Sequence, residues 1–181
     1  MTNINWSNIA QATEFYQAHG FEYIETPWIA DYDTLAFTCS DVDRIITVDD
    51  NKGLVGSAEQ GFMQLAIDGK LPHVNYVSAG PCFRVEEYDE LHQPQFFKVE
   101  LFTLCNADNA AYAANELLNR AWKFMKCVPN KVQTDDGFDL EINGIEVGSY
   151  GTRYHELIGW WAYGTGLAEP RYTLALSQST S

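Results

Sequence analysis

Residues 80–102, "GPCFRVEEYDELHQPQFFKVELF", place an arginine and several acids between two apolar runs. Two strands joined by a short polar loop form a β-hairpin, and alternate residues of each strand share one face. Arg84 and Glu86 then point the same way on the first strand, and Phe96, Lys98 and Glu100 do so on the second. A cation, carboxylates and an aromatic ring on paired strands predict a polar floor for a charged, planar ligand.

The elements around this hairpin predict an α+β fold. Helical spacing of apolar residues predicts helices over residues 5–20, from Ser57 to Gly69, and over 108–127 with Asp108 as N-cap. Strands are expected at 21–29, 34–39, 44–50, and at 138–142 and 145–155 around the Asn143-Gly144 turn. Residues 160–176 predict a strand, a glycine turn and a last helix. Because the strands meet mostly by hairpins, we expect an antiparallel β-sheet flanked by helices, in a single domain over residues 1–181.

Composition and charge exclude several classes of function. Twenty-five Asp and Glu against eleven Lys and Arg leave a formal net charge of −14. Nucleic-acid binding depends on cations that contact phosphates. We therefore expect no DNA binding, and no binding of a full-length tRNA by this protein alone. Without an apolar run of about 18 residues or a basic, apolar leader, a cytoplasmic protein that does not span a membrane is expected. The four cysteines are widely spaced, which predicts neither a zinc site nor disulfides.

Two arginines on separate elements form the first candidate constellation. Arg84 and Arg171 suit an anion such as a triphosphate, because guanidinium is planar and permanently charged. The alternative is two surface ion pairs. "GTGLAEPR" adds Gly164 and Gly166 at an expected helix start, where backbone N–H groups favour phosphate, although these glycines also fit a simple turn.

Acids on expected strands form the second constellation. They are Glu86, Glu100, Asp139, Glu141 and Glu146. Carboxylates that share a sheet face repel one another unless a cation joins them, and magnesium bridging phosphates is the usual one. The alternative is that half of them face solvent on an open sheet. Of the adjacent Phe96 and Phe97, one packs in the core and the other can cover a ligand ring.

These stretches resemble the catalytic core of a class II aminoacyl-tRNA synthetase, most closely that of the seryl branch. "PCFRVE" and "QFFKVE" are similar to the second class motif, "GTGLAEPR" to the third, and "GSAE" to the stretch that precedes the hairpin. "FDLEINGIEVGSYGTR" resembles the strand pair before the third motif, and "EVGSYGTRYH" also looks like the aspartyl branch. "GFEYIETP" matches the first motif loosely.

The resemblance implies ligands and roles. The ligands are ATP, Mg2+ and an amino acid, and the implied assembly is a homodimer that pairs through the first motif. Arg84 would hold the α-phosphate, Glu86 would help to place ATP, Phe96 would stack on adenine and Arg171 would lie near the γ-phosphate. The remaining implied positions are Glu146 and Ser149 for magnesium and phosphate, Gly164 and Gly166 in the glycine-rich motif, and Ser57, Glu59 and Glu100 for the amino acid.

Two departures from the family bear on the acceptor of the activated amino acid. The tRNA-binding N-terminal arm and an anticodon domain are not expected within these 181 residues, and the loop inside the hairpin is short. We therefore expect formation of an aminoacyl-adenylate and transfer to a carrier protein, a small amine or a minimal RNA. The alternatives are tRNA aminoacylation with help from a partner, and a catalytically silent paralogue that binds a nucleotide or amino acid and acts in regulation.

Overall fold

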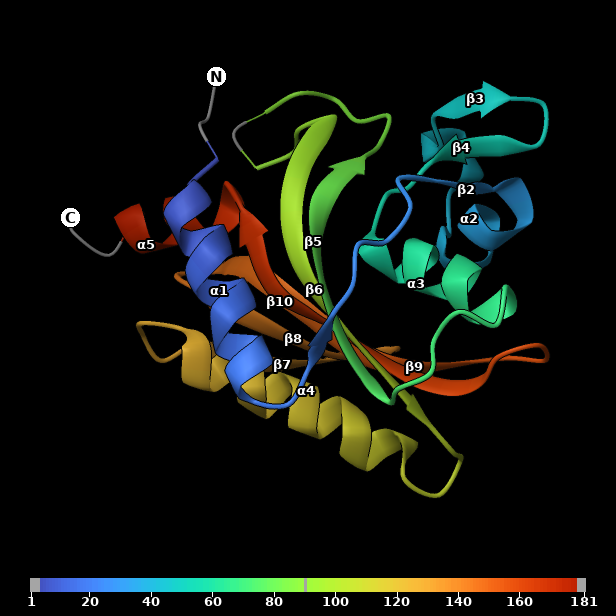
Figure 1. Cartoon of the computed structure of the whole chain (residues 1–181). Coiled ribbons are helices and arrows are strands. Elements are labelled where there is room, and N and C mark those ends of the chain that lie inside the picture. The colour runs from blue at the N-terminus through green and yellow to red at the C-terminus, as the bar shows by residue number, and fades with distance from the viewer. Residues whose placement is uncertain (1–3, 90, 179–181) are drawn as a thin grey trace.

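The computed structural model describes residues 4–89 and 91–178, and its centre is a seven-stranded sheet in the order β1-β5-β6-β10-β9-β8-β7 (Figure 1). All neighbouring strands are antiparallel except β1, which pairs with β5 in parallel. The strands are β1 Glu22–Tyr23, β5 Asn75–Phe83, β6 Gln95–Cys105, β7 Asn130–Thr134, β8 Gly137–Ile142, β9 Ile145–His155 and β10 Gly159–Glu169.

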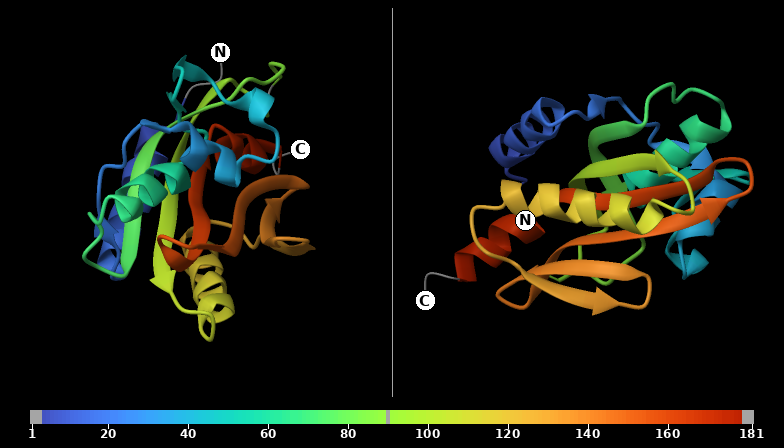
Figure 2. Two further views of the ribbon diagram at one scale, coloured as in Figure 1. Left: turned by 90° about the vertical axis from the view of Figure 1, so that its right-hand side faces the viewer. Right: turned by 90° about the horizontal axis from the view of Figure 1, so that it is seen from below.

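Helices cover both faces of this sheet (Figure 2). The apolar faces of α1 (Trp6–Ala18), α4 (Ala110–Phe124) and α5 (Arg171–Ser177) join one face of the sheet in the larger core. Helix α3 (Ala58–Ile67) packs on the other face, where Phe62 stacks on Phe102 of β6. None of the helices among the described residues is long and apolar enough to cross a membrane.

A small sheet lies beside α3 at one end of the molecule (Figure 1). Its strands, in the order β2-β4-β3, are β2 Ile29–Asp31, β4 Lys52–Leu54 and β3 Thr47–Asp49. Helix α2 (Tyr32–Thr38) and the 3-10 helix η1 (Val42–Arg44) connect β2 to β3. We call residues 29–55 the small-sheet unit. Its own core is Ala30, Leu35 and Val55.

The α+β fold with an antiparallel sheet flanked by helices is as predicted, and a hairpin forms where it was expected. Its first strand ends at Phe83, however, so Arg84 and Glu86 lie in the loop after the strand and not on it. Its strands β5 and β6 pair over nine positions, from Asn75 with Thr103 to Phe83 with Gln95. The Asn143-Gly144 turn joins β8 to β9, and both residues have positive φ, as that tight turn requires.

Three local predictions are wrong. Residues 34–39 belong largely to helix α2 and not to a strand, because Leu35 packs into the core of the small-sheet unit and tertiary burial outweighs local strand preference. The expected strand over 21–29 is two separate short strands, β1 and β2. The N-cap of α4 is Asn109 and not Asp108.

The expected glycine turn before the last helix is also wrong. Gly164 and Gly166 lie inside β10, which continues to Glu169 with a bulge between Thr165 and Leu167. A Cβ atom on Gly164 would come within 2.6 Å of the Tyr150 ring, and one on Gly166 within 2.6 Å of the Tyr16 ring. Because both glycines lack a side chain, the buried tyrosine rings can pack directly against the backbone of β10.

Candidate active site

Two adjoining cavities lie where the hairpin, β9, β10 and the small-sheet unit meet. We call the first, of about 350 Å³, the arginine cavity; its walls include Arg84, Glu86, Phe96, Glu146 and Arg171. We call the second, of about 490 Å³, the glutamate cavity; its walls include Ser57, Glu59, Glu100 and Arg153. The residues that line both are Arg44, Arg84, Lys98, Ser149 and Thr165.

The alternation of side chains along β6 turns three of the predicted residues toward these cavities. Phe96, Lys98 and Glu100 face them, whereas Phe97 points to the opposite face and packs on Trp6 of α1. The core ring of the pair is therefore Phe97, and Phe96 is the one free to cover a ligand.

Arg84 lies at the junction of the two cavities. Its Nε and Nη2 atoms donate hydrogen bonds of 3.2 and 3.0 Å to the carbonyl of Gly56, and its guanidinium carbon lies 5.2 Å from the centre of the Phe96 ring. In the described part of the chain it makes no salt bridge, whereas Arg44, Arg153 and Arg171 each pair with a carboxylate. Among the described arginines that line the cavities, Arg84 is thus the one whose charge has no carboxylate partner and stays available for an anion.

Arg171 reaches the same cavity from the start of α5. Its Nη1 atom lies 3.5 Å from Oε2 of Glu146, and its Nη2 atom donates to the carbonyl of Leu91 at 3.4 Å. The side chain of Glu146 is about half exposed, at 47%. Since solvent screens a pair of this kind, an incoming anion can compete for Arg171 at modest cost.

Ser57 and Glu100 form one side of the glutamate cavity. The Ser57 hydroxyl donates to both oxygens of Glu100, at 2.9 and 3.1 Å, and the Ala58 backbone N–H also donates to that carboxylate. Lys98 Nζ is farther away, 3.4 Å from Oε1. The single Ser57 proton is shared between the two oxygens, so these contacts come from three donors, Ser57, Ala58 and Lys98. A carboxylate has about four lone-pair positions, so Glu100 keeps capacity for a further donor.

Glu59 is buried and fully paired. Its two oxygens lie 2.7 Å from Nη1 of Arg153, and Oε1 also accepts a 2.8 Å hydrogen bond from the Trp161 indole. Burial raises the pKa of Glu59, and Arg153 and Trp161 offset part of that rise. Arg153, whose guanidinium also lies over the Tyr163 ring, was missed in the sequence; a lone arginine in a strand of glycine and tyrosine was the signal for it.

Three of the strand acids lie on β8 and β9: Glu146 lines the arginine cavity, Asp139 lines the glutamate cavity and Glu141 lines neither. Ser149, the cross-strand partner of Asp139, donates a hydrogen bond to that carboxylate, while burial raises the pKa of Asp139. Glu141 and Glu146 are direct partners across β8 and β9. Within the residues the structure describes, no three His, Cys, Asp or Glu side chains are grouped closely enough to hold a metal ion by themselves.

The predicted glycines do not join this site. Neither Gly164 nor Gly166 lines the cavities, whereas Thr165 between them lines both. The expected phosphate-binding turn is replaced by continuous strand, so the two arginines rather than that backbone offer positive charge.

The family model for "tRNA synthetases class II (D, K and N)" matches residues 3–137. The chain belongs to the class II tRNA synthetase family. The family relationship expected from the hairpin and its neighbours is therefore confirmed. The matching model is that of the D, K and N branch. The aspartyl-like pattern of residues 146–155 lies outside the matched residues, so that pattern and the closer likeness to the seryl branch both stay predictions. A search of curated proteins found no significant match.

Solved class II structures share the fold at low sequence identity. Pyrrolysyl-tRNA synthetase from Desulfitobacterium hafniense superposes with a TM-score of 0.75 at 14% identity, over 96% of this chain and 69% of that one. Seryl-tRNA synthetase from Pyrococcus horikoshii, solved with ATP, gives 0.72 at 20% identity, over 92% and 48%. The cytoplasmic serine-tRNA ligase from Naegleria fowleri, solved with AMP, gives 0.72 at 17% identity, over 93% and 52%. This class II chain therefore spans about half the length of those seryl enzymes.

Proposed function

We propose that this class II synthetase domain activates an amino acid with ATP to form an aminoacyl-adenylate. Activation of amino acids by a ligase is the general chemistry of its family. The observation that carries the proposal is the arginine cavity. Arg84 and Arg171 enter it from two distant parts of the chain, and Phe96 lines it. Arg84 has no carboxylate partner in the described residues, whereas Arg171 pairs with Glu146. Two guanidinium groups and one ring suit a nucleoside triphosphate.

The reaction needs positioning more than acid–base chemistry. The ionised carboxylate of the amino acid attacks the α-phosphorus, a P–O bond to the acyl group forms, the bond to the β-phosphate oxygen breaks, and pyrophosphate leaves. The nucleophile is already an anion, so no side chain has to remove a proton. Arg84 at the junction of the cavities would stabilise the charge on the α-phosphate, and Arg171 would bind the terminal phosphates.

The glutamate cavity would hold the amino acid in this proposal. Glu100 keeps lone pairs for an α-ammonium group, and Ser57 orients its carboxylate. Glu59 would have a different role from Glu100, because its oxygens already accept hydrogen bonds from Arg153 and Trp161. It would shape the floor rather than contact the ammonium group.

Magnesium fits the oxygen donors of β8 and β9. Glu146 and Ser149, with Asp139 beside them, are hard ligands of the kind the ion prefers. Magnesium takes one or two carboxylates and completes its shell with phosphates and water, so a large protein cage is not required. When bound, the ion would neutralise charge on the phosphates, while Glu146 would have to turn from Arg171 toward it.

The acceptor and the assembly are further parts of the proposal. The chain's net charge of −14 favours transfer to a carrier protein, a small amine or a minimal RNA over unaided binding of a full-length tRNA. Incubation with ATP, a labelled amino acid and each acceptor in turn distinguishes these; efficient charging of tRNA transcripts by the protein alone would contradict the non-standard acceptor. We also propose a homodimer, as is common in the family. The cytoplasmic location stays a prediction.

Exchange of labelled pyrophosphate into ATP tests the proposed activity. We expect exchange that depends on one amino acid, and a loss of about 10²–10³-fold in Arg84→Ala, because a donor at the developing charge is removed. Arg120→Ala is the matched control, since this arginine of α4 lines neither cavity. Exchange with none of the twenty amino acids would favour the silent paralogue, and full activity of Arg84→Ala would mean that the site lies elsewhere.

A further inference from the structure

Arg44 is a cavity residue that no sequence pattern indicated. It ends the 3-10 helix η1 in the small-sheet unit, and it lines both the arginine cavity and the glutamate cavity. Its side chain is 39% exposed, whereas that of Glu86, its ion-pair partner, is only 8% exposed. It is the one cation that the small-sheet unit contributes to the described walls of the two cavities.

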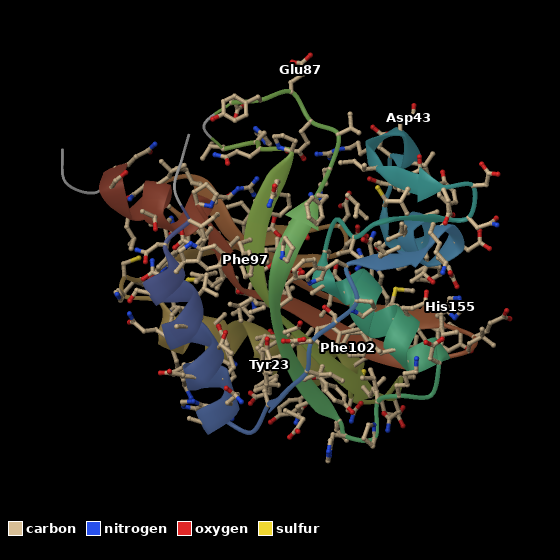
Figure 3. The ribbon with its side chains drawn as sticks, turned by 45° about the horizontal axis from the view of Figure 1, so that its top comes forward. Tyr23, Asp43, Glu87, Phe97, Phe102 and His155 are labelled. Atoms are coloured by element: carbon tan, nitrogen blue, oxygen red, sulfur yellow. The ribbon has the colours of Figure 1, made fainter. Side chains whose placement is uncertain are left out.

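Arg44 holds the start of the hairpin loop by two contacts. Its carbonyl accepts a 2.9 Å hydrogen bond from the Val85 backbone N–H, and its Nη2 atom pairs with Oε1 of Glu86. A neighbouring backbone bond, from Phe83 N–H to the Val55 carbonyl at 2.9 Å, connects the same two elements. Figure 3 labels the sequence neighbours Asp43 and Glu87 at the end of the molecule where the small-sheet unit meets the hairpin loop.

The position of Glu86 depends on this pair. A carboxylate that is nearly removed from solvent is costly unless a cation compensates it. Arg84, two residues earlier, donates to Gly56 and makes no salt bridge with Glu86 in the described residues. Arg44 is therefore the side chain that neutralises Glu86 and keeps it at the wall of the arginine cavity.

We propose that Arg44 is a positioning residue for the nucleotide: it fixes Glu86 at the arginine cavity and holds the small-sheet unit against the hairpin. This inference rests on the proposed function, with a nucleoside triphosphate as the ligand of the arginine cavity. One residue then forms part of both cavity walls, so the nucleotide and amino-acid sites are built together.

The Arg44→Met variant tests the role in activity. This change removes the charge while keeping an unbranched apolar chain. We expect the KM for ATP in pyrophosphate exchange to rise about tenfold with a smaller change in kcat, because an element that orients the nucleotide is lost. Arg44→Lys, which can still pair with Glu86, should recover most of the loss. In a Glu86→Gln background the Arg44→Met change should add little, because its partner charge is already gone.

Lys52→Met is the matched control, because Lys52 belongs to the same small sheet and lines neither of the two cavities. It should leave the KM for ATP unchanged. Equal effects of Arg44→Met and Lys52→Met on the KM would overturn the positioning role. So would equal effects of Arg44→Met with and without the Glu86→Gln change.

Amide hydrogen exchange tests the attachment without relying on activity. The Val85 amide bonds to the Arg44 carbonyl, and the Phe83 amide bonds to Val55. In Arg44→Met both amides should exchange faster than in the wild type and in Lys52→Met, because the ion pair beside them is absent. Unchanged exchange would overturn the proposed attachment. A wild type that neither binds ATP nor catalyses pyrophosphate exchange would instead refute the proposed function. The amide hydrogen-exchange rates would still decide whether Arg44 holds the small-sheet unit against the hairpin.

Discussion

Glu169, the last residue of β10, is a buried carboxylate that no cation in the described part of the chain neutralises. It is 1% exposed, and its Oε1 atom accepts hydrogen bonds of 2.8 Å from Asn8 of α1 and 2.9 Å from Thr173 of α5. Its Oε2 atom has no hydrogen-bond partner among the described residues. Glu169 therefore connects two helices at the wall of the arginine cavity, at the cost of a desolvated charge.

Burial raises the pKa of Glu169 above its usual 4.5. The folded state then favours the protonated acid, so the stabilising contribution is complete below pH 4.5 and is lost as the pH rises through the higher folded pKa. Glu169→Gln keeps an acceptor for Asn8 and Thr173 without the charge. We expect it to be at least as stable as the wild type at pH 7, with the advantage disappearing toward pH 4.

Denaturant unfolding between pH 4 and pH 8 measures this difference. Glu14→Gln, at an exposed position of α1, is the control that should track the wild type. A constant difference in free energy of unfolding between wild type and Glu169→Gln across the whole range would contradict a raised pKa.

At the scale of the element, the strand β6 assigns opposite roles to two adjacent rings. Phe96 lines the arginine cavity, with Arg84 5.2 Å and Lys98 5.8 Å from its ring centre. Phe97 packs at 4.9 Å on the ring of Trp6 and joins the core under α1. The same substitution at the two positions should therefore have different consequences.

Phe96→Leu should raise the KM for ATP about tenfold with little loss of stability, since a stacking surface for a base is worth about 1–3 kcal/mol. Phe97→Leu should lower the free energy of unfolding by about 1 kcal/mol and leave the KM nearly unchanged. Pyrophosphate exchange kinetics and thermal unfolding of both variants measure the two effects. A similar rise in KM for both would refute the division of roles between the faces of β6.

At the scale of the whole molecule, an apolar surface lies beside the edge strand β1. Trp28 is 57% exposed and Ile29 47%, and Tyr23 of β1 lies near them around a hollow of about 1060 Å³. An exposed tryptophan next to a sheet edge is unusual for an uncovered surface. We therefore locate the proposed homodimer interface at residues 23–31.

Sedimentation velocity tests this interface. We expect a dimer for the wild type and a monomer for Trp28→Glu, because a buried unpaired carboxylate would oppose association. Tyr112→Glu is the control, since Tyr112 is 69% exposed on α4, on a different element. A wild type that sediments as a monomer would refute the homodimer, and a dimeric Trp28→Glu would place the interface elsewhere.

The local order of residues determined the hairpin, its polar face and the family. Strand alternation depends only on neighbouring residues, so the shared direction of Phe96, Lys98 and Glu100 on β6 follows from the sequence. The same is true of the Asn143-Gly144 turn, whose two positive φ angles those residues tolerate.

Only the tertiary structure decided which charges are available. Arg44 and Glu86 lie far apart in the sequence, as do Glu59 and Arg153, and pattern reasoning has no measure of such pairing. Pattern reasoning also placed residues 34–39 in a strand, although burial of Leu35 makes them largely helical. It predicted a turn at Gly164 and Gly166, although these glycines lie in a strand and leave space for two tyrosine rings. The physical reason is the same in each case: burial and long-range ion pairs depend on residues brought together by folding, and a local pattern contains only neighbours along the chain.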